Sequence, residues 1–235
     1  PGPFFINTVW LEKVGKEMPT TVEEFKDVLM AFRDAGDLNG NGLADEIPYT
    51  LDFGNTNSFD SYDTFNQFCN AFGMQNTAAG RANDYLAIVD GKVVFTAADP
   101  AYRETCKFFN ELYTENLIDI NAFTPGADRS IPPFSSVISS SDVAIYGVFS
   151  MWNILTYMQD ADVAAQYAPL PRMTGPTGRK TGEVVNLSEM QEAARFVITT
   201  ECEDPDTLIK LADYIYKPEI SVQANNGMAG YLMQY

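Results

Sequence analysis

The ten residues from Asp37 to Glu46 restrict local folding more than any other segment of the chain. Oxygen-bearing side chains recur there at every second position, at Asp37, Asn39 and Asn41. The neighbouring asparagines and glycines let the backbone curl, so these side chains can converge on one point. Gly42 stands at the sixth position, where calcium loops of the EF-hand kind turn sharply. The spacing predicts a loop that binds a cation.

A shell of oxygen atoms is the predicted ligand set of this loop. Its members are Asp37, Asn39, Asn41, the carbonyl of Leu43, Asp45 and Glu46. Such a set suits Ca²⁺ better than Mg²⁺, which demands a tighter octahedron. Pro48 occupies the twelfth position, where an EF-hand carries a bidentate Glu, so Glu46 would close the shell instead. The predicted role is structural, and the alternative is an ordinary Asn-Gly turn that binds nothing.

The charge balance limits the classes of partner. The chain has 32 acidic and 15 basic residues, a formal net charge of −17, which disfavours nucleic acids and anionic lipids as partners. Neutral sugars and cations remain compatible, and the charge could also serve solubility alone. There is no histidine, which excludes Ser-His-Asp catalysis and His-ligated zinc. The three cysteines are far apart, and we expect Cys69 and Cys106 to be buried thiols.

Hydrophobic periodicity and turn residues predict a mixed α and β fold. Helices are predicted at 21–35, about 59–72, 100–115 and 205–216, a β-hairpin at 85–95, and strands at 142–148 and 195–199. A loop is predicted at 125–141, and a surface loop or hairpin tip at 168–182. The first helix has a capping-box pair, Thr21 and Glu24, and ends before Gly36. On the third helix we expect a buried side formed by Tyr102, Cys106, Phe109 and Tyr113. No apolar run is long enough to span a membrane, and no signal peptide is visible.

The first 48 residues resemble the family 1 extracellular solute-binding proteins, in the branch of lipoproteins that serve carbohydrate ABC importers. The matching residues are Trp10-Leu11, Lys13, Gly15, Met18–Thr21 and Asp45–Pro48. The resemblance implies an α/β, periplasmic-binding-protein-like fold, of which the chain would be mainly one lobe of a two-lobe hinged receptor. Residues 1–235 would form one solute-binding domain, mostly the second lobe, with hinge-crossing segments near 1–10 and 195–235.

The same resemblance implies the partners and the location. We expect a monomeric, extracellular, cell-surface lipoprotein, or a periplasmic protein, that delivers a carbohydrate to an ABC transporter permease. Membrane association would occur only through a lipid anchor that this chain does not contain.

Aromatic residues at a predicted strand-to-helix junction are the candidate carbohydrate contacts. Sugars place C–H faces on aromatic rings, and their hydroxyls need polar partners. Tyr146, Trp152 and Asn153 lie at this junction, and ligands of α/β folds bind beyond the carboxyl ends of strands. Trp10 is a further candidate. For each aromatic the alternative is core packing, and for Trp10 it is packing between lobes.

Three functions remain open. The first is the capture, without catalysis, of a carbohydrate for delivery to an ABC importer, with a structural calcium site; the carbohydrate expected is an oligosaccharide. The second is a glycoside hydrolase that uses two carboxylates, although Glu183 and Glu189, for example, carry no distinguishing motif. The third is a calcium-dependent adhesion or docking module, a class that usually duplicates its calcium loop.

Overall fold

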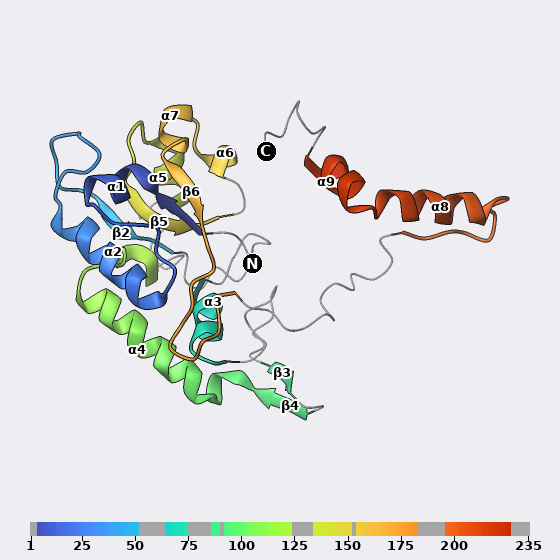
Figure 1. The fold of residues 1–235 in the computed structure, drawn as a ribbon, viewed down its shortest axis with the longest axis horizontal. Helices are drawn as coiled ribbons and strands as arrows, with labels where there is room; N and C mark the ends of the chain where they lie inside the picture. Colours follow the sequence, from blue (N-terminus) through green and yellow to red (C-terminus); the bar gives the residue numbers. More distant parts are fainter. Residues whose placement is uncertain are drawn as a thin grey trace. The chain divides into compact units, whose positions relative to one another are not determined.

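The computed structural model describes residues 4–51, 64–74, 86–89, 92–123, 134–151, 154–182 and 196–226. The chain divides into two compact units, Pro1–Glu189 and Met190–Tyr235 (Figure 1). None of the helices in the described residues is both long and apolar enough to cross a membrane.

A four-stranded mixed sheet lies at the centre of the first unit, in the order β2-β5-β1-β6. The strands are β1 (Phe4–Asn7), β2 (Ile47–Tyr49), β5 (Tyr146–Ser150) and β6 (Tyr167–Leu170). Strand β1 pairs antiparallel with β5 and with β6, whereas β2 pairs parallel with β5. Every residue of β1 and β5 is buried, so both faces of these strands are covered. Continuous apolar runs such as Phe4–Ile6 suit such a position.

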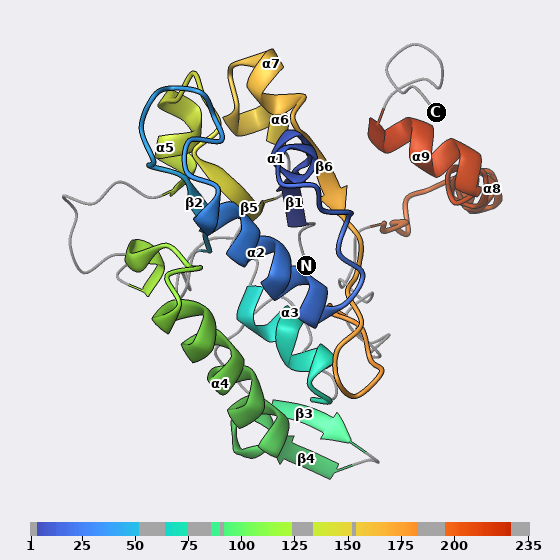
Figure 2. The same ribbon diagram turned by 60° about the vertical axis from the view of Figure 1, so that its left-hand side comes forward.

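Helices and a separate hairpin complete the first unit. The helices are α1 (Thr8–Lys13), α2 (Val22–Asp34), α3 (Thr64–Ala71), α4 (Pro100–Thr114), α5 (Phe134–Ser140), α6 (Ile154–Tyr157) and α7 (Ala161–Ala164), with 3₁₀ turns η1 (Thr96–Ala98) and η2 (Ile120–Phe123). Strands β3 (Leu86–Val89) and β4 (Lys92–Phe95) form the antiparallel hairpin expected at 85–95. Helices α2 and α4 lie side by side in Figures 1 and 2, and Lys26 forms ion pairs with Glu111 and Glu115 across them.

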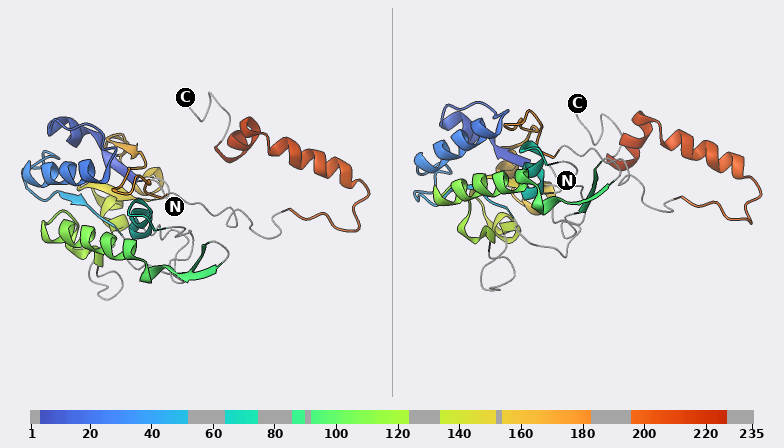
Figure 3. Two further views of the ribbon diagram at one scale, coloured as in Figure 1. Left: turned by 60° about the horizontal axis from the view of Figure 1, so that its bottom comes forward. Right: turned by 90° about the horizontal axis from the view of Figure 1, so that it is seen from below.

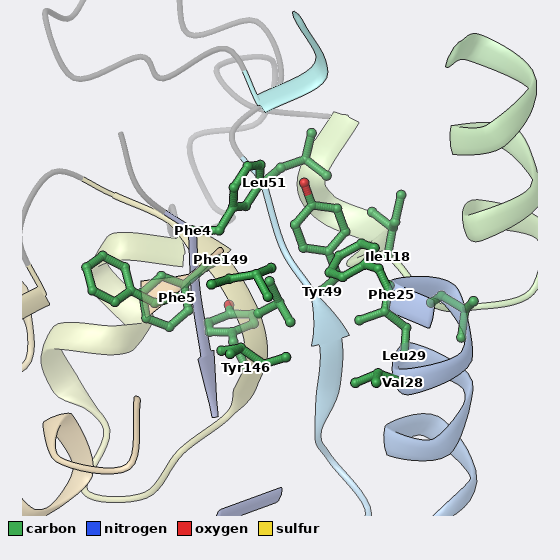
Figure 4. Packing of buried hydrophobic residues seen from close by; sticks show 14 of the residues in the cluster. Phe4, Phe5, Phe25, Val28, Leu29, Tyr49, Leu51, Ile118, Tyr146 and Phe149 are labelled. Atoms are coloured by element: carbon green, nitrogen blue, oxygen red, sulfur yellow. The ribbon is translucent and has the colours of Figure 1, made fainter. Parts of the chain in front are cut away.

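Helix α2 forms where the sequence predicts it. The side chain of Thr21 accepts a hydrogen bond from the Glu24 backbone N–H, and the Glu24 carboxylate accepts one from the Thr21 N–H. The pKa of Glu24 lies below its usual value, mainly because the Thr20 N–H and hydroxyl donate to its carboxylate, with a smaller contribution from Thr21. After the last turn Gly36 adopts a φ of 74°, which a residue with a Cβ rarely takes. One face of the helix is buried and includes Phe25 and Leu29, which Figure 4 shows beside Tyr49 of β2.

Phe68 of α3 joins four elements in the core. Its ring has no exposed surface and contacts Phe4 of β1, Phe25 of α2, and Phe108 and Phe109 of α4, with centroid separations of 5.3–5.8 Å. Edge-on and stacked aromatic contacts at these separations stabilise a core beyond area burial alone. The predicted helix at about 59–72 is therefore confirmed over its described part, and residues 59–63 lie outside the described residues.

The expected buried side of α4 is wrong by one position. Its buried residues are Ala101, Thr105, Phe108, Phe109 and Leu112. Of the predicted set only Phe109 is buried, and Tyr113 and Cys106 are exposed. The small residues Ala101 and Thr105 allow close packing, whereas the sequence reasoning favoured the larger side chains. Cys69 is buried, as expected.

Other element boundaries also differ from the expectation. Residues 134–140 of the predicted loop form α5, and the strand expected at 142–148 runs from Tyr146 to Ser150. Residues 196–199 are not a strand, and Phe196 and Val197 are exposed there. A short apolar segment becomes a strand only where a neighbouring strand pairs with it, and hydrophobicity alone does not predict that pairing.

Residues 196–226, the described part of the second unit, contain two helices, drawn from orange to red in Figure 3. Helix α8 (Pro205–Ile215) begins after Asp204, whose side chain accepts a hydrogen bond from the Thr207 N–H. Helix α9 (Pro218–Asn226) follows. Pro218 is therefore the first residue of a second helix, a position that suits proline. The helix predicted at 205–216 is confirmed. The mixed α and β fold class is confirmed. The single domain expected over 1–235 stays a prediction.

Gly147 of β5 provides a test of this packing. A Cβ at this position would lie 2.6 Å from Phe32 Cδ2 and 2.7 Å from the Pro48 carbonyl oxygen. We expect Gly147→Ala to lower the free energy of unfolding by about 1–3 kcal/mol, because backbone and ring must both move. Urea denaturation measures the change. The control is Gly178→Ala, which adds the same methyl group with no atom within 4 Å, although its φ of 80° adds some strain. An equal or larger loss in the control would contradict this account.

Candidate functional site

Asp37 organises the first half of the predicted cation-binding loop. Its Oδ1 accepts a hydrogen bond from the Gly40 N–H at 2.6 Å, and its Oδ2 accepts one from the Gly42 N–H at 2.9 Å. Gly40 and Gly42 have φ values of 81° and 85°, in the left-handed region that favours glycine. The backbone therefore curls around the Asp37 carboxylate, as the spacing predicts.

Asn39, Asn41 and Asp45 are brought together in the second half of the loop. The Oδ1 atoms of Asn39 and Asn41 accept hydrogen bonds from the N–H groups two residues later, at 2.9 and 2.8 Å. The Nδ2 atom of Asn41 lies 3.2 Å from both Asp45 carboxylate oxygens, and that of Asn39 lies 3.3 Å from one of them. Each asparagine oxygen keeps a second lone pair that could meet a cation.

Glu46 is the carboxylate most closely integrated into the loop. Its Oε1 accepts hydrogen bonds from the N–H groups of Leu38 and Asn39 at 2.6 and 2.8 Å. Its Oε2 is buried and has no hydrogen-bond partner among the described residues. A buried carboxylate oxygen without a partner is costly, and a cation beside it would remove that cost. Glu46 therefore fits the role of closing the ligand shell, which in an EF-hand belongs to a Glu at the position that Pro48 occupies here.

The loop depends on neutral oxygens as well as on carboxylates. Among the described residues, no three Asp, Glu, Cys or His side chains gather closely enough to hold a metal by themselves. A cation here would need the amide oxygens of Asn39 and Asn41 and a backbone carbonyl, which Leu43 would supply. The exposed fraction of Leu43 is 61%, so its side chain contributes nothing to the core. Oxygen ligands of this mixed kind suit calcium.

Two long-range contacts fix the loop to the first unit. Lys13 Nζ, at the end of α1, donates to the Leu38 carbonyl at 2.6 Å, and Asn39 Nδ2 donates to the Ala144 carbonyl at 3.1 Å. Sequence reasoning did not identify either anchor, because each joins residues far apart in the chain. The only sequence signal is that Lys13 belongs to the segment that carries the family resemblance.

The structure does not support Trp10 and Tyr146 as carbohydrate contacts. Trp10 has no exposed surface and packs edge-on against Phe32, with ring centroids 5.5 Å apart. Tyr146 is 4% exposed, and burial, aided by the nearby charge of Asp119, raises the pKa of its hydroxyl above the usual value. Both rings therefore pack in the core of the first unit, which is the alternative named for Tyr146, whereas the alternative named for Trp10 was packing between lobes. Trp152 and Asn153 lie outside the described residues, directly after Met151.

The second half of the predicted loop at 168–182 forms a hairpin tip with a buried base. Thr174 pairs antiparallel with Lys180, and Met173 and Thr181 are buried. The Thr177 hydroxyl donates to the Ala71 carbonyl at 2.8 Å, which attaches the tip to the end of α3. The segment is thus a structural part of the first unit, and its first three residues belong to β6.

Comparison with known sequences identifies relatives along almost the whole chain. No family model matches. The chain is 36% identical over 230 residues to the fructooligosaccharide ABC transporter substrate-binding protein FusA of Streptococcus pneumoniae, covering 96% of this chain and 38% of that protein. It is 26% identical over 231 residues to lipoprotein LipO of Bacillus subtilis, covering 96% of this chain and 42% of that protein. The chain therefore spans about two fifths of the length of these relatives.

Solved structures give the same result. An EF-hand mutant of S. pneumoniae FusA in complex with fructo-nystose matches with a TM-score of 0.61 and 31% identity, covering 100% of this chain and 43% of that one. A solute-binding protein that binds HMO, from Bifidobacterium longum infantis, matches with a TM-score of 0.61 and 27% identity, covering 99% and 46%. The expected periplasmic-binding-protein-like fold, present in part, is confirmed. Over these 235 residues the chain is a homologue of the carbohydrate-binding proteins of ABC transporters.

Proposed function

We propose that the protein containing this chain captures an oligosaccharide, without transforming it, and delivers it to an ABC importer. The observation that carries this proposal is the 36% identity to a fructooligosaccharide-binding component over 96% of the chain. A solved structure of that relative contains kestose, and another contains fructo-nystose. The proposed partners are therefore a carbohydrate ligand and a transporter permease. The proposed form is a monomer at the cell surface or in the periplasm, attached to the membrane only by a lipid anchor.

Structural calcium at the loop is the second part of the proposal. The residues proposed to hold it are Asp37, Asn39, Asn41, Leu43 through its carbonyl, Asp45 and Glu46. Support comes from the curled backbone around Asp37 and from the buried Oε2 of Glu46. A divalent cation would offset the repulsion among Asp37, Asp45 and Glu46. One solved structure of FusA is that of an EF-hand mutant, which is consistent with a cation-binding loop of this kind in the family.

The carbohydrate contacts are proposed at Trp152 and Asn153. Both positions directly follow Met151, which continues from the end of β5, where α/β proteins commonly place ligands. An aromatic ring followed by an amide would supply a stacking surface and a hydroxyl partner. Trp10 and Tyr146 are left out of this proposal because both are buried.

The alternative functions receive less support. A glycoside hydrolase would need two carboxylates at a defined separation around the bond to be cleaved. The relatives are substrate-binding proteins rather than hydrolases. A calcium-dependent adhesion module would be expected to repeat its loop, and the sequence contains one copy. Carbohydrate capture is therefore preferred.

Calcium should stabilise the folded chain. A ligand that binds only the native state at a free concentration about 100 times its Kd adds about 2.7 kcal/mol to the free energy of unfolding. We expect calcium chloride to raise the Tm and EGTA to lower it. Asp37→Ala should abolish this difference, because it removes a ligand and the two hydrogen bonds that curl the loop. Differential scanning calorimetry measures both effects.

The matched control is Asp27→Ala, which removes an exposed carboxylate from α2 outside the loop. It should keep the full difference between calcium and EGTA. A wild-type Tm that is the same in calcium and in EGTA would sink the calcium part of the proposal and leave the carbohydrate part standing.

The protein that contains this chain should bind kestose and release no smaller sugar. Trp152→Ala should weaken binding roughly tenfold or more, the size expected when a stacked aromatic ring is lost. Isothermal titration calorimetry measures the affinity, and chromatography of the incubated sugar detects any product. Leu155→Ala is the control, since it removes an apolar side chain that is 72% exposed on the next helix. Released fructose would favour the hydrolase, and an unchanged affinity of Trp152→Ala would remove Trp152 from the site.

A further inference from the structure

We propose that Asn39 is a positioning residue through which calcium in the loop fixes the start of strand β5. This inference rests on the proposed calcium site and goes beyond it, because it assigns the loop an effect on a strand 105 residues away. It concerns the two ends of one side chain, its amide oxygen and its amide nitrogen.

The Asn39 side chain has different partners at its two ends. Its Oδ1 stays within the loop and accepts a hydrogen bond from the Asn41 N–H at 2.9 Å. Its Nδ2 donates to the Ala144 carbonyl at 3.1 Å and lies 3.3 Å from Asp45 Oδ1. A primary amide has two N–H donors beside its oxygen, so it can serve the loop and the strand together. A carboxylate in the same place could not donate to Ala144.

The backbone next to Asn39 is held from two more directions. The Asn39 N–H donates to Glu46 Oε1 at 2.8 Å, and the preceding carbonyl, of Leu38, accepts from Lys13 Nζ at 2.6 Å. Leu38 is itself 4% exposed. The backbone of Asn39 is thus held in place. If calcium fixes the position of its side-chain oxygen, the position of its side-chain nitrogen is fixed as well.

The point at which Asn39 meets the sheet lies just before β5. The Ala144 carbonyl belongs to the second residue before Tyr146, where β5 begins. The next carbonyl, of Ile145, accepts from the Ile47 N–H at 2.9 Å. The loop therefore contacts the start of β5 through Asn39, while the strand that leaves the loop, β2, pairs with β5 from Ile47 onward.

Strand β5 has little freedom to absorb a displacement along its length. All five residues from Tyr146 to Ser150 are buried, and β1 and β2 bond to it on both sides. Phe32 and the Pro48 carbonyl lie so close to Gly147 that a methyl group there would force them to move. A packed strand of this kind moves as a unit rather than bending locally. Fixing its start would therefore also fix the direction in which its end points.

Asn41 offers a matched comparison within the same loop. It has the same side chain, and its Oδ1 accepts from a backbone N–H two residues later, as that of Asn39 does. Its Nδ2, however, donates to Asp45 and to no residue of the sheet that the structure describes. Replacing either asparagine by aspartate keeps an oxygen for a cation. Only Asn39→Asp removes the N–H that reaches Ala144.

Hydrogen–deuterium exchange of the full chain, with calcium chloride and with EGTA, tests the inference. In wild type and in Asn41→Asp we expect calcium to slow amide exchange in a peptide covering residues 143–151 by about fivefold, the effect of one net hydrogen bond. In Asn39→Asp this slowing should be lost, while calcium still raises the Tm. The Tm readout separates loss of the contact with the sheet from loss of calcium binding.

The outcomes distinguish this inference from the proposed calcium site. Equal slowing in Asn39→Asp and Asn41→Asp would overturn the role of Asn39 and leave the calcium site intact. A calcium-dependent Tm in wild type with unchanged exchange at 143–151 would overturn it too, and this measurement needs no variant. A wild-type Tm indifferent to calcium would overturn both.

Discussion

The pairing of β5 with β1 on one side and β2 on the other is the constraint on which the first unit depends. It joins segments about 100 and 140 residues apart and buries every side chain of the central strand. Helix α2 can approach because Gly147 leaves room for the Phe32 ring. Phe32 in turn packs against Trp10 of α1. The glycine in β5 therefore lets the aromatic rings of Phe32 and Trp10 pack close to this strand.

The loop between α2 and β2 presents an electrostatic problem that its own hydrogen bonds solve in part. Three carboxylates lie within ten residues, in a chain of net charge −17. Backbone N–H groups neutralise part of the charge of Asp37 and of one Glu46 oxygen, and asparagine amides do the same for Asp45. The second oxygen of Glu46 has no such partner among the described residues. That remaining need is the physical basis for proposing a cation.

Features set by neighbouring residues could be predicted from the sequence, and features set by distant contacts could not. The capping box of Thr21 and Glu24 and the turn around Asp37 depend on residues within five positions, and both form as expected. The buried side of α4 depends on which face meets α3, and there the small residues Ala101 and Thr105 are buried instead of Cys106. The Trp10 and Tyr146 rings were candidate ligands because aromatics serve both cores and sugar sites. Only their burial separates these roles.

The parallel pairing of β2 and β5 also determines how the two proposed sites are related. In a parallel pair both strands begin at the same end, so the loop before Ile47 lies at the end where β5 also begins. The proposed carbohydrate positions, Trp152 and Asn153, follow the opposite end of β5. The four steps of about 3.3 Å between the first and last of its five residues separate the two ends by roughly 13 Å. In the proposed arrangement, a cation in the loop would act on a bound sugar by positioning β5, the strand between the two proposed sites.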